Sequence, residues 1–131
     1  MAKPIKAINT YSPRIKTGKP ASMEQLITFI AGRTGLTRGN IQHTISELVE
    51  GLTFFNLAGQ GVTIEGLGFY YPTVNLEGTI TTSYRIDPKL KAELNKKNSF
   101  HGKMLNWDMI GKTSAELVAR WNEEHPDDPV D

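Results

Sequence analysis

Two stretches in the first half of the chain repeat apolar residues at helical spacing. The first follows Ser22, which forms a capping-box pattern with Gln25 because each side chain can satisfy a backbone amide that the first helical turn leaves unpaired. Gly32 and Gly35 end this stretch. The pattern predicts a helix that starts at Ser22 and has an apolar face made by Met23, Leu26, Ile27 and Ile30.

The second helical stretch begins near Thr37, a good N-cap residue. Phe54 and Leu57 widen its apolar stripe near the C-terminal end, so this end is apolar over more than one face. The preceding helix cannot cover all of that surface, which indicates a further partner and hints at a dimer. The main stripe consists of Ile41, Ile45, Leu48, Val49, Leu52 and Phe55.

The middle of the chain alternates in the manner of strands. Residues 62–65 alternate apolar and polar side chains, Gly66-Leu67-Gly68 breaks the run, and residues 69–71 resume it. Pro72 indicates an edge strand or a bulge. We therefore expect a hairpin whose second strand has one face made by Ile80, Thr82, Tyr84 and Ile86.

A third helix is expected directly after this hairpin. Asp87 is a cap residue and Pro88 suits the first helical position, so the helix is predicted to continue from Lys89 to Lys97 with Leu90 and Leu94 inward.

The two ends of the chain have weaker patterns. Residues 1–21 contain three prolines and no clear periodicity, which predicts an extended basic arm. Residues 98–112 are irregular, Thr113 with Glu116 opens a fourth helix near residues 114–124, and an acidic tail follows.

Composition narrows the range of possible functions. Of the 131 residues, 38% are hydrophobic and 22% are charged, which is typical of a globular domain. The sequence has no cysteine, no apolar run of membrane-spanning length, and no apolar stretch after the basic N-terminal residues. We therefore expect no thiolate metal site, no membrane partner and no secretory signal.

The near-neutral net charge hides an uneven distribution. Residues 1–20 hold five bases and no acid, residues 85–112 hold seven bases and three acids, and residues 121–131 hold five acids and no Lys or Arg. Such asymmetry can mark a polyanion site. The charge pattern alone nevertheless favours the simpler interpretation of a solvated arm and a solvated helix face.

Enzyme signatures are weak. Gly111-Lys112-Thr113 ends like a phosphate-binding loop, but Asn106 stands where that motif requires glycine. His43, His101 and His125 are scattered, without the spacing of metal ligands. We therefore expect neither catalytic residues, nor a metal, nor a cofactor, and no enzyme.

Several motifs in the order helix, helix, hairpin and helix resemble the HU/IHF family of bacterial DNA-binding proteins. Two runs carry most of the resemblance: residues 30–38, Ile-Ala-Gly-Arg-Thr-Gly-Leu-Thr-Arg, and residues 62–69, Val-Thr-Ile-Glu-Gly-Leu-Gly-Phe. The step from Tyr84 to Pro88 is similar to the strand-to-helix closure of that fold. The match covers about residues 22–97 and is closest to HU-related proteins with an N-terminal extension.

The resemblance implies an α+β fold with an HU/IHF-like core, here with an extra C-terminal helix. It divides the chain into an arm (1–21), an HU/IHF-like domain (22–97) and a C-terminal extension (98–131). It also implies an intertwined dimer with itself or with a paralogous subunit, and sequence-tolerant binding and bending of DNA. The expected dimer interface comprises Ile45, Leu48, Leu52, Phe54, Phe55 and Phe69.

One departure from the family is pronounced. HU and IHF reach around DNA with a long basic β-arm tipped by proline, whereas here only Leu76-Glu77-Gly78 separates the two strands. The wedging mechanism therefore does not carry over, and only contacts with backbone phosphates remain. The candidate nucleic-acid-binding residues are Lys3, Lys6, Arg14, Lys16, Lys19, Arg85, Lys89, Lys91, Lys96 and Lys97.

Two functions follow from these observations. The first is a dimeric architectural protein of the bacterial nucleoid that binds duplex DNA weakly and without sequence specificity. The second is a non-enzymatic structural subunit with an HU-like fold, such as a phage virion or tail component, which does not bend DNA. In the second, the basic arm of one copy and the acidic tail of the next could link neighbours into a larger assembly.

Overall fold

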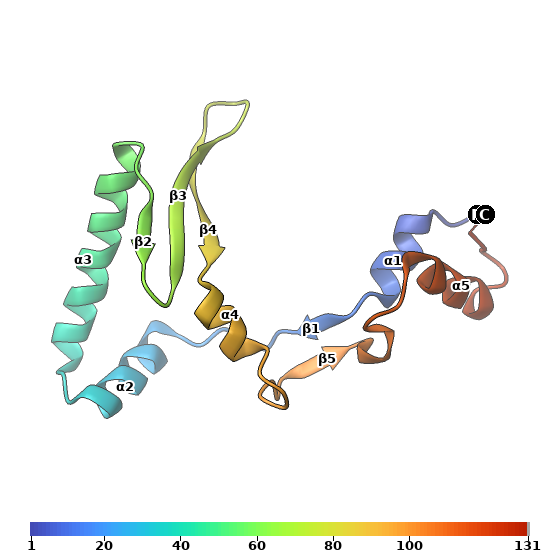
Figure 1. The fold of residues 1–131 in the computed structure, drawn as a ribbon, viewed down its shortest axis with the longest axis horizontal. Helices are drawn as coiled ribbons and strands as arrows, with labels where there is room; N and C mark the ends of the chain where they lie inside the picture. The colour runs from blue at the N-terminus through green and yellow to red at the C-terminus, as the bar shows by residue number, and fades with distance from the viewer. Residues whose placement is uncertain (131) are drawn as a thin grey trace. The chain divides into compact units, whose positions relative to one another are not determined.

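The computed structural model describes residues 1–130, and the chain folds into two units (Figure 1). The central unit comprises residues 20–100, and the terminal unit combines residues 1–19 with the segment from residue 101 onward. Each unit has its own helices and its own small antiparallel sheet. No helix within residues 1–130 has both the length and the apolarity that a membrane crossing requires.

Two capped helices open the central unit, α2 (Met23–Thr34) and α3 (Arg38–Leu57). The capping box of α2 is confirmed, because Ser22 Oγ accepts from Gln25 N at 3.1 Å and Gln25 Oε1 accepts from Ser22 N at 2.8 Å. Gly35 ends α2 with a positive φ of 75°. The Thr37 hydroxyl accepts from the backbone N–H of Asn40 and so caps α3, as the sequence predicts.

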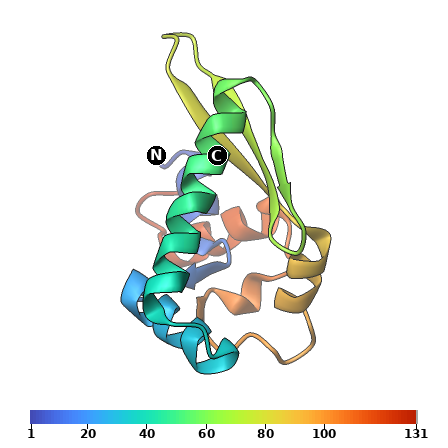
Figure 2. The same ribbon diagram turned by 90° about the vertical axis from the view of Figure 1, so that its left-hand side faces the viewer.

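A three-stranded antiparallel sheet in the order β2-β3-β4 follows, made by β2 (Val62–Ile64), β3 (Gly68–Val74) and β4 (Ile80–Ile86). Because β2 pairs only with the start of β3, Pro72 lies where β3 has a free edge, which accommodates its missing N–H. The β3–β4 hairpin extends beyond the end of α3 (Figures 1 and 2).

The two faces of this sheet differ. Thr82 Oγ1 donates to Asn56 Oδ1 of α3 at 2.8 Å, so the face that carries Thr82 is turned toward α3. Side chains alternate along a strand, and the other face, with Phe69, Tyr71 and Arg85, therefore points away from α3. The predicted helix after the hairpin is α4 (Pro88–Leu94), three residues shorter than expected.

The central unit buries little apolar surface. Only two hydrophobic side chains of this unit are buried, Ile27 and Ile41, with 1% and 3% of their surfaces exposed. Large hydrophobic side chains stay exposed on every helix, among them Leu26, Phe29, Leu48, Val49, Phe54, Leu57 and Leu94. One copy of the central unit therefore lacks the core that a domain of its length normally forms.

The prediction of an extended arm over residues 1–21 is wrong. Residues Pro4–Tyr11 form helix α1, and Arg14–Lys16 form strand β1. Proline is tolerated at the first helical position, and the helix is held by tertiary contact, because Ala7 and Tyr11 are buried one turn apart against α5 (Ser114–Glu124). The fourth predicted helix is confirmed as α5, capped by the Thr113 hydroxyl.

The segment predicted to be irregular also has structure. It contains β5 (Lys103–Leu105), which pairs with β1, and a short 3-10 helix, η1 (Trp107–Met109). Met109 is buried, while Trp107 and Ile110 remain exposed. The core of the terminal unit consists of Ala7, Tyr11, Met109, Leu117, Trp121 and Val130.

The acidic tail folds back within the terminal unit. Trp121 Nε1 donates to Asp128 O at 2.7 Å, and Asn122 exchanges two hydrogen bonds with the backbone of Val130. Asp128 also forms ion pairs with the N-terminal amino group at 3.3 Å and with Lys6 at 3.9 Å. Part of the opposite charge of the two ends is thus paired within one chain, through Asp128, Lys6 and the N-terminal amino group.

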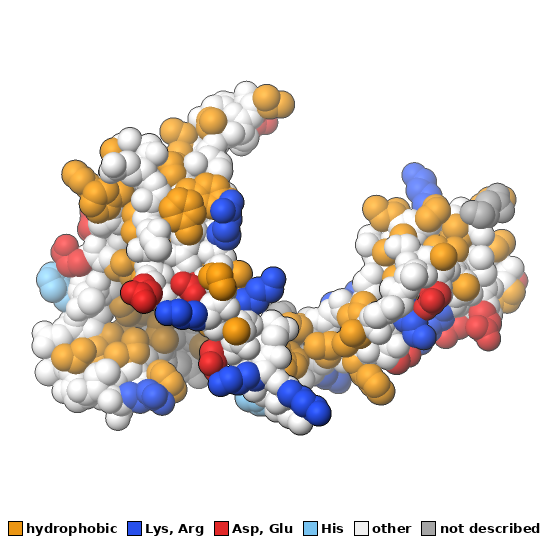
Figure 3. Space-filling model, viewed as in Figure 1, with side chains coloured by type: hydrophobic (Ala, Val, Ile, Leu, Met, Phe, Trp, Pro, Cys, Tyr) orange, Lys and Arg blue, Asp and Glu red, His pale blue; other side chains and the backbone are white. Residues whose placement is uncertain are grey.

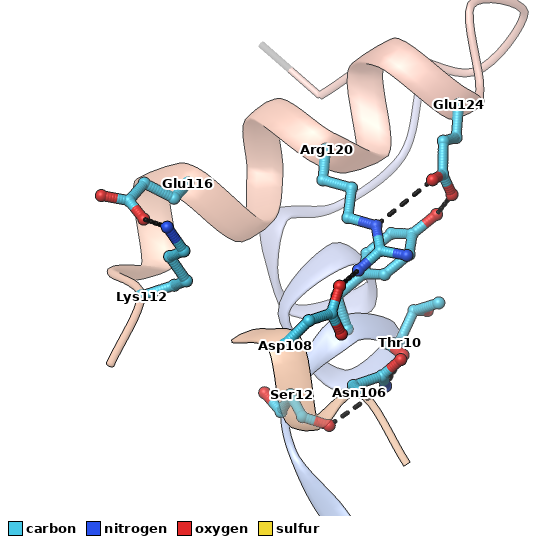
Figure 4. A network of polar contacts seen from close by, with 9 residues as sticks. Thr10, Ser12, Asn106, Asp108, Lys112, Glu116, Arg120 and Glu124 are labelled. Atoms are coloured by element: carbon cyan, nitrogen blue, oxygen red, sulfur yellow. Dashed lines mark hydrogen bonds and ion pairs between the residues drawn. The ribbon is translucent and has the colours of Figure 1, made fainter. Parts of the chain in front are cut away.

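A polar network joins α1 to α5 and η1 (Figure 4). Tyr11 Oη donates to Glu124, and Arg120 donates to Glu124 and to Asp108 at 3.2 Å each. The hydrogen bond from Tyr11, followed by the one from Arg120, lowers the pKa of Glu124, and the same bond raises the pKa of Tyr11.

Candidate nucleic-acid interface

The predicted basic segment begins where β4 runs into α4, and Asp87 fixes this junction. Its carboxylate accepts from the backbone N–H of Lys89 at 2.8 Å and from that of Gly66 at 3.1 Å. The backbone N–H of Asp87 donates to Leu67 O at 3.2 Å. Asp87 therefore caps α4 and ties its start to the turn between β2 and β3.

Five cations follow one another along this part of the chain, which we call the β4–α4 edge: Arg85 on β4, Lys89 and Lys91 on α4, and Lys96 and Lys97 just after α4. Lys89 pairs with Glu65 at 3.7 Å and Lys96 with Glu93 at 3.1 Å, and all four side chains are largely exposed. Exposed pairs of this kind are weak, so these cations stay accessible to another anion. In the part of the chain that the structure describes, Lys91, Lys97 and Arg85 form no ion pair with an acid.

The outward face of the sheet adds aromatic and hydroxyl groups beside Arg85. The Phe69 and Tyr71 rings stack with centroids 5.3 Å apart, and the Arg85 guanidinium lies 5.6 Å from the Tyr71 ring. The hydroxyl of Thr73 lies 3.1 Å from that of Thr81. Figure 3 shows hydrophobic side chains next to basic ones over this sheet, and further basic side chains over α4.

Sequence reasoning missed Tyr71, Thr73 and Thr81 as parts of this face. A sequence signal existed for Thr81, because it alternates along the strand with Thr82 and Tyr84, which sequence reasoning placed on a shared face. Tyr71 and Thr73 join Thr81 through the register of β3 with β4, which has no local signal. Tyr84 lies on the face toward α3, where its hydroxyl donates to Leu67 O at 2.7 Å. Desolvation, and to a lesser extent Tyr70, raises the pKa of Tyr84.

The other five predicted cations belong to the terminal unit. Lys6 is engaged there, since it pairs with Asp128 and lies 5.3 Å from the Trp121 ring. Lys3 directly precedes α1, and Lys19 follows β1. Arg14 and Lys16 lie on β1. The ten candidate residues thus form two sets of five, one in each unit.

The six expected dimer-interface residues also fall into two groups. Ile45, Leu48, Leu52, Phe54 and Phe55 lie on α3, and Phe54 is the most exposed of them at 69%. Phe69 instead belongs to the outward sheet face, and its ring lies so close to Gly61 that an added Cβ there would be 2.4 Å away. The structure therefore does not join Phe69 to the apolar surface of α3.

The site contains no arrangement that resembles a metal centre. Among residues 1–130, no three His, Cys, Asp or Glu side chains are grouped so that they could hold a metal ion.

Comparison with known proteins finds similarity to solved structures but not to a family model or a curated protein. No family model matches the sequence, and no curated protein matches it. Among solved structures, the chain is similar to a mutant of the HU protein from Thermotoga maritima, with a TM-score of 0.49 and 16% sequence identity. The likeness covers 56% of this chain and 99% of the HU chain.

Proposed function

We propose that the protein is a non-enzymatic, dimeric DNA-binding protein that contacts the phosphates of duplex DNA without reading its sequence. The observation that carries this proposal is the β4–α4 edge, where Asp87 holds a helix that presents exposed lysines and Arg85 adds a guanidinium. Phosphate contacts require only positive charge within reach, and such a cluster supplies it.

The same geometry argues against direct readout of bases. Specific readout requires a helix or ribbon that enters a groove with side chains able to pair with base edges. The hairpin tip carries Leu76 and Glu77, and an acidic side chain next to the phosphates would weaken binding. We therefore expect affinity from the cations of the edge, and little preference among sequences.

A second copy supports this function in two ways. It would cover the apolar surface of α3, which one chain leaves exposed around Phe54. It would also double the number of phosphate contacts on one DNA molecule, and contacts made together strengthen binding beyond either alone. A protein with this function would be located in the bacterial nucleoid.

The test is fluorescence anisotropy of a labelled duplex of about 30 base pairs, titrated with the full chain between about 50 and 200 mM salt. We expect binding that weakens steeply with salt. The variant Lys91→Gln/Lys97→Gln should flatten the slope of log affinity against log salt by about 0.9 for each lysine that no longer binds a phosphate. The matched control is Arg33→Gln/Lys112→Gln, which also removes two charges but lies outside the edge. No binding at the lowest salt, or equal slopes for both variants, contradicts the proposal.

A second candidate is a structural subunit of a larger assembly, for example a virion or tail component. The hairpin tip favours it, since Val74, Leu76 and Ile80 are exposed there beside an acid and no base. Such a tip suits an apolar protein surface better than DNA. Absent DNA binding together with ordered oligomers larger than a dimer in sedimentation would favour this candidate.

A further inference from the structure

The terminal unit carries a basic face whose residues come from opposite ends of the sequence. Strands β1 and β5 are antiparallel, with Arg14 opposite Leu105, Ile15 opposite Met104, and Lys16 opposite Lys103. Opposed residues share a face of a strand pair, and neighbours along a strand alternate. Arg14, Lys16 and Lys103 therefore lie on one face of this two-stranded ribbon, and Ile15 and Met104 lie on the other.

These three cations lack neutralising partners. All three are exposed, and none forms an ion pair with any acid of residues 1–130. Lys16 and Lys103 are directly opposed, which places their Cβ atoms about 5 Å apart and makes them repel each other.

Several acids that could relieve this repulsion are engaged elsewhere in the unit. Asp108 and Glu124 bind Arg120, each at 3.2 Å. Glu116 pairs with Lys112 at 3.9 Å, and Asp128 pairs with Lys6 and the N-terminal amino group. The unit thus neutralises charge around α1 and α5 and leaves it uncompensated on the ribbon.

The ribbon is also held in place at one end. Asn106, the residue after β5, adopts a left-handed conformation with φ 57° and donates from Nδ2 to Thr10 O at 2.9 Å and to Ser12 O at 3.2 Å (Figure 4). These two carbonyls flank the bend between α1 and β1. Asn106 therefore fixes the end of β5 to the start of β1, so the cationic face is preorganised.

We propose that the Arg14–Lys16–Lys103 face of the β1–β5 ribbon is a second nucleic-acid contact, which binds phosphates of duplex DNA. This inference rests on the proposed function, because it adds a contact in the terminal unit to the one at the β4–α4 edge. A bound phosphate backbone would supply the negative charge that the opposed lysines lack, and counterions released from the DNA would favour the contact. Lys103, which sequence reasoning left out, becomes a binding residue through its position opposite Lys16.

The experiment compares three double variants of the full chain in the duplex titration. The ribbon variant is Lys16→Gln/Lys103→Gln, the edge variant is Lys91→Gln/Lys97→Gln, and the control is Arg33→Gln/Lys112→Gln. Each removes two positive charges, so a general change in net charge affects all three equally. The thermal midpoint of each variant checks folding, and removal of the opposed charges should leave that of the ribbon variant unchanged or raised.

We expect the ribbon variant to lose about 1.8 from the salt slope for each chain that contacts the duplex, 0.9 for each lysine–phosphate contact. For one contacting chain, the wild type should then lose roughly tenfold more affinity than this variant does between about 50 and 200 mM salt, and for two contacting chains the difference is larger. If the ribbon variant matches the control while the edge variant loses slope, the ribbon inference is overturned and the proposed function stands. If the ribbon variant alone loses slope, the ribbon is the DNA contact and the proposed edge is wrong. A wild-type chain that does not bind duplex at the lowest salt overturns both.

Discussion

Asn106 shows how one side chain can organise a junction. Its amide satisfies two backbone carbonyls, and its left-handed backbone is one that asparagine tolerates better than most residues.

Both tryptophans of the sequence, Trp107 and Trp121, lie in the terminal unit. Tryptophan fluorescence therefore reports selectively on the unfolding of this unit.

The amide and the backbone of Asn106 can be tested separately. Asn106→Gly keeps the left-handed conformation but removes both hydrogen bonds, and should lower the free energy of unfolding of the terminal unit by about 1 kcal/mol. Asn106→Ala should lose about 1 kcal/mol more, because its Cβ disfavours this conformation. Urea unfolding followed by tryptophan fluorescence measures both values. A glycine variant as stable as the wild type would show that the two hydrogen bonds contribute nothing.

Glu124 should make the terminal unit sensitive to acid. Its pKa lies below the ordinary value of 4.5, so its contribution to stability is present above that value and is lost as the pH falls through the lowered pKa. At pH values below about 4.5, the temperature at which half of the wild-type protein is unfolded, measured by tryptophan fluorescence, should therefore fall. Glu124→Gln, which can still accept from Tyr11 but does not titrate, should weaken this dependence. Parallel pH profiles of the two proteins would exclude Glu124 as the cause.

At the scale of elements, predictability follows the distance over which each element is stabilised. The starts of α2, α3, α4 and α5 were predicted correctly because each cap residue and its partner lie within three positions of each other. The helix α1 was missed because its stabilising contacts are remote, and the Tyr11–Glu124 bond spans 113 positions. For the same reason sequence reasoning identified Arg14 and Lys16 as basic candidates but not their neighbour Lys103, since strand register between chain ends has no local signal.

Gly68 is the position where the sheet tolerates no side chain. A Cβ there would lie 2.4 Å from Arg85 O and 2.4 Å from the Tyr84 ring, and the glycine has a φ of 153°. Gly68→Ala should therefore push β3 away from β4 and lower the free energy of unfolding of the central unit by about 2 kcal/mol or more. Thermal unfolding followed by far-UV circular dichroism measures the loss.

The matched control for this substitution is Gly32→Ala. Gly32 lies in α2, and no atom outside its own helix lies within 4 Å of an added Cβ. Alanine has the higher helix propensity, so this variant should be unchanged or more stable by up to about 1 kcal/mol. Equal destabilisation by both variants would mean that the contacts of Gly68 are not the cause.

At the scale of the whole molecule, the most prominent feature is the apolar surface that one chain leaves exposed to water. The central unit buries two hydrophobic side chains, whereas its helices leave many more in contact with water. Burial of apolar area is the dominant favourable term in folding, so we expect a partner that covers this surface to add to the stability of a unit with so small a core. The sequence indicates this partner through the double-faced stripe of α3, because that stripe exceeds what one neighbouring helix can cover.

Self-association through α3 can be measured directly. We expect sedimentation velocity to show the wild type as a dimer at about 100 µM, with dissociation on dilution. Phe54→Ser removes a ring that is already 69% exposed in one chain, so it should leave the fold of that chain intact while it weakens the dimer. A central aromatic contact contributes about 2 kcal/mol or more, which corresponds to a rise of about 30-fold in the dissociation constant. The control is Leu76→Ser at the hairpin tip, which removes an exposed apolar side chain outside α3 and should not change the constant. If Leu76→Ser weakens association as much as Phe54→Ser does, the chains associate through the hairpin, and α3 is not the interface.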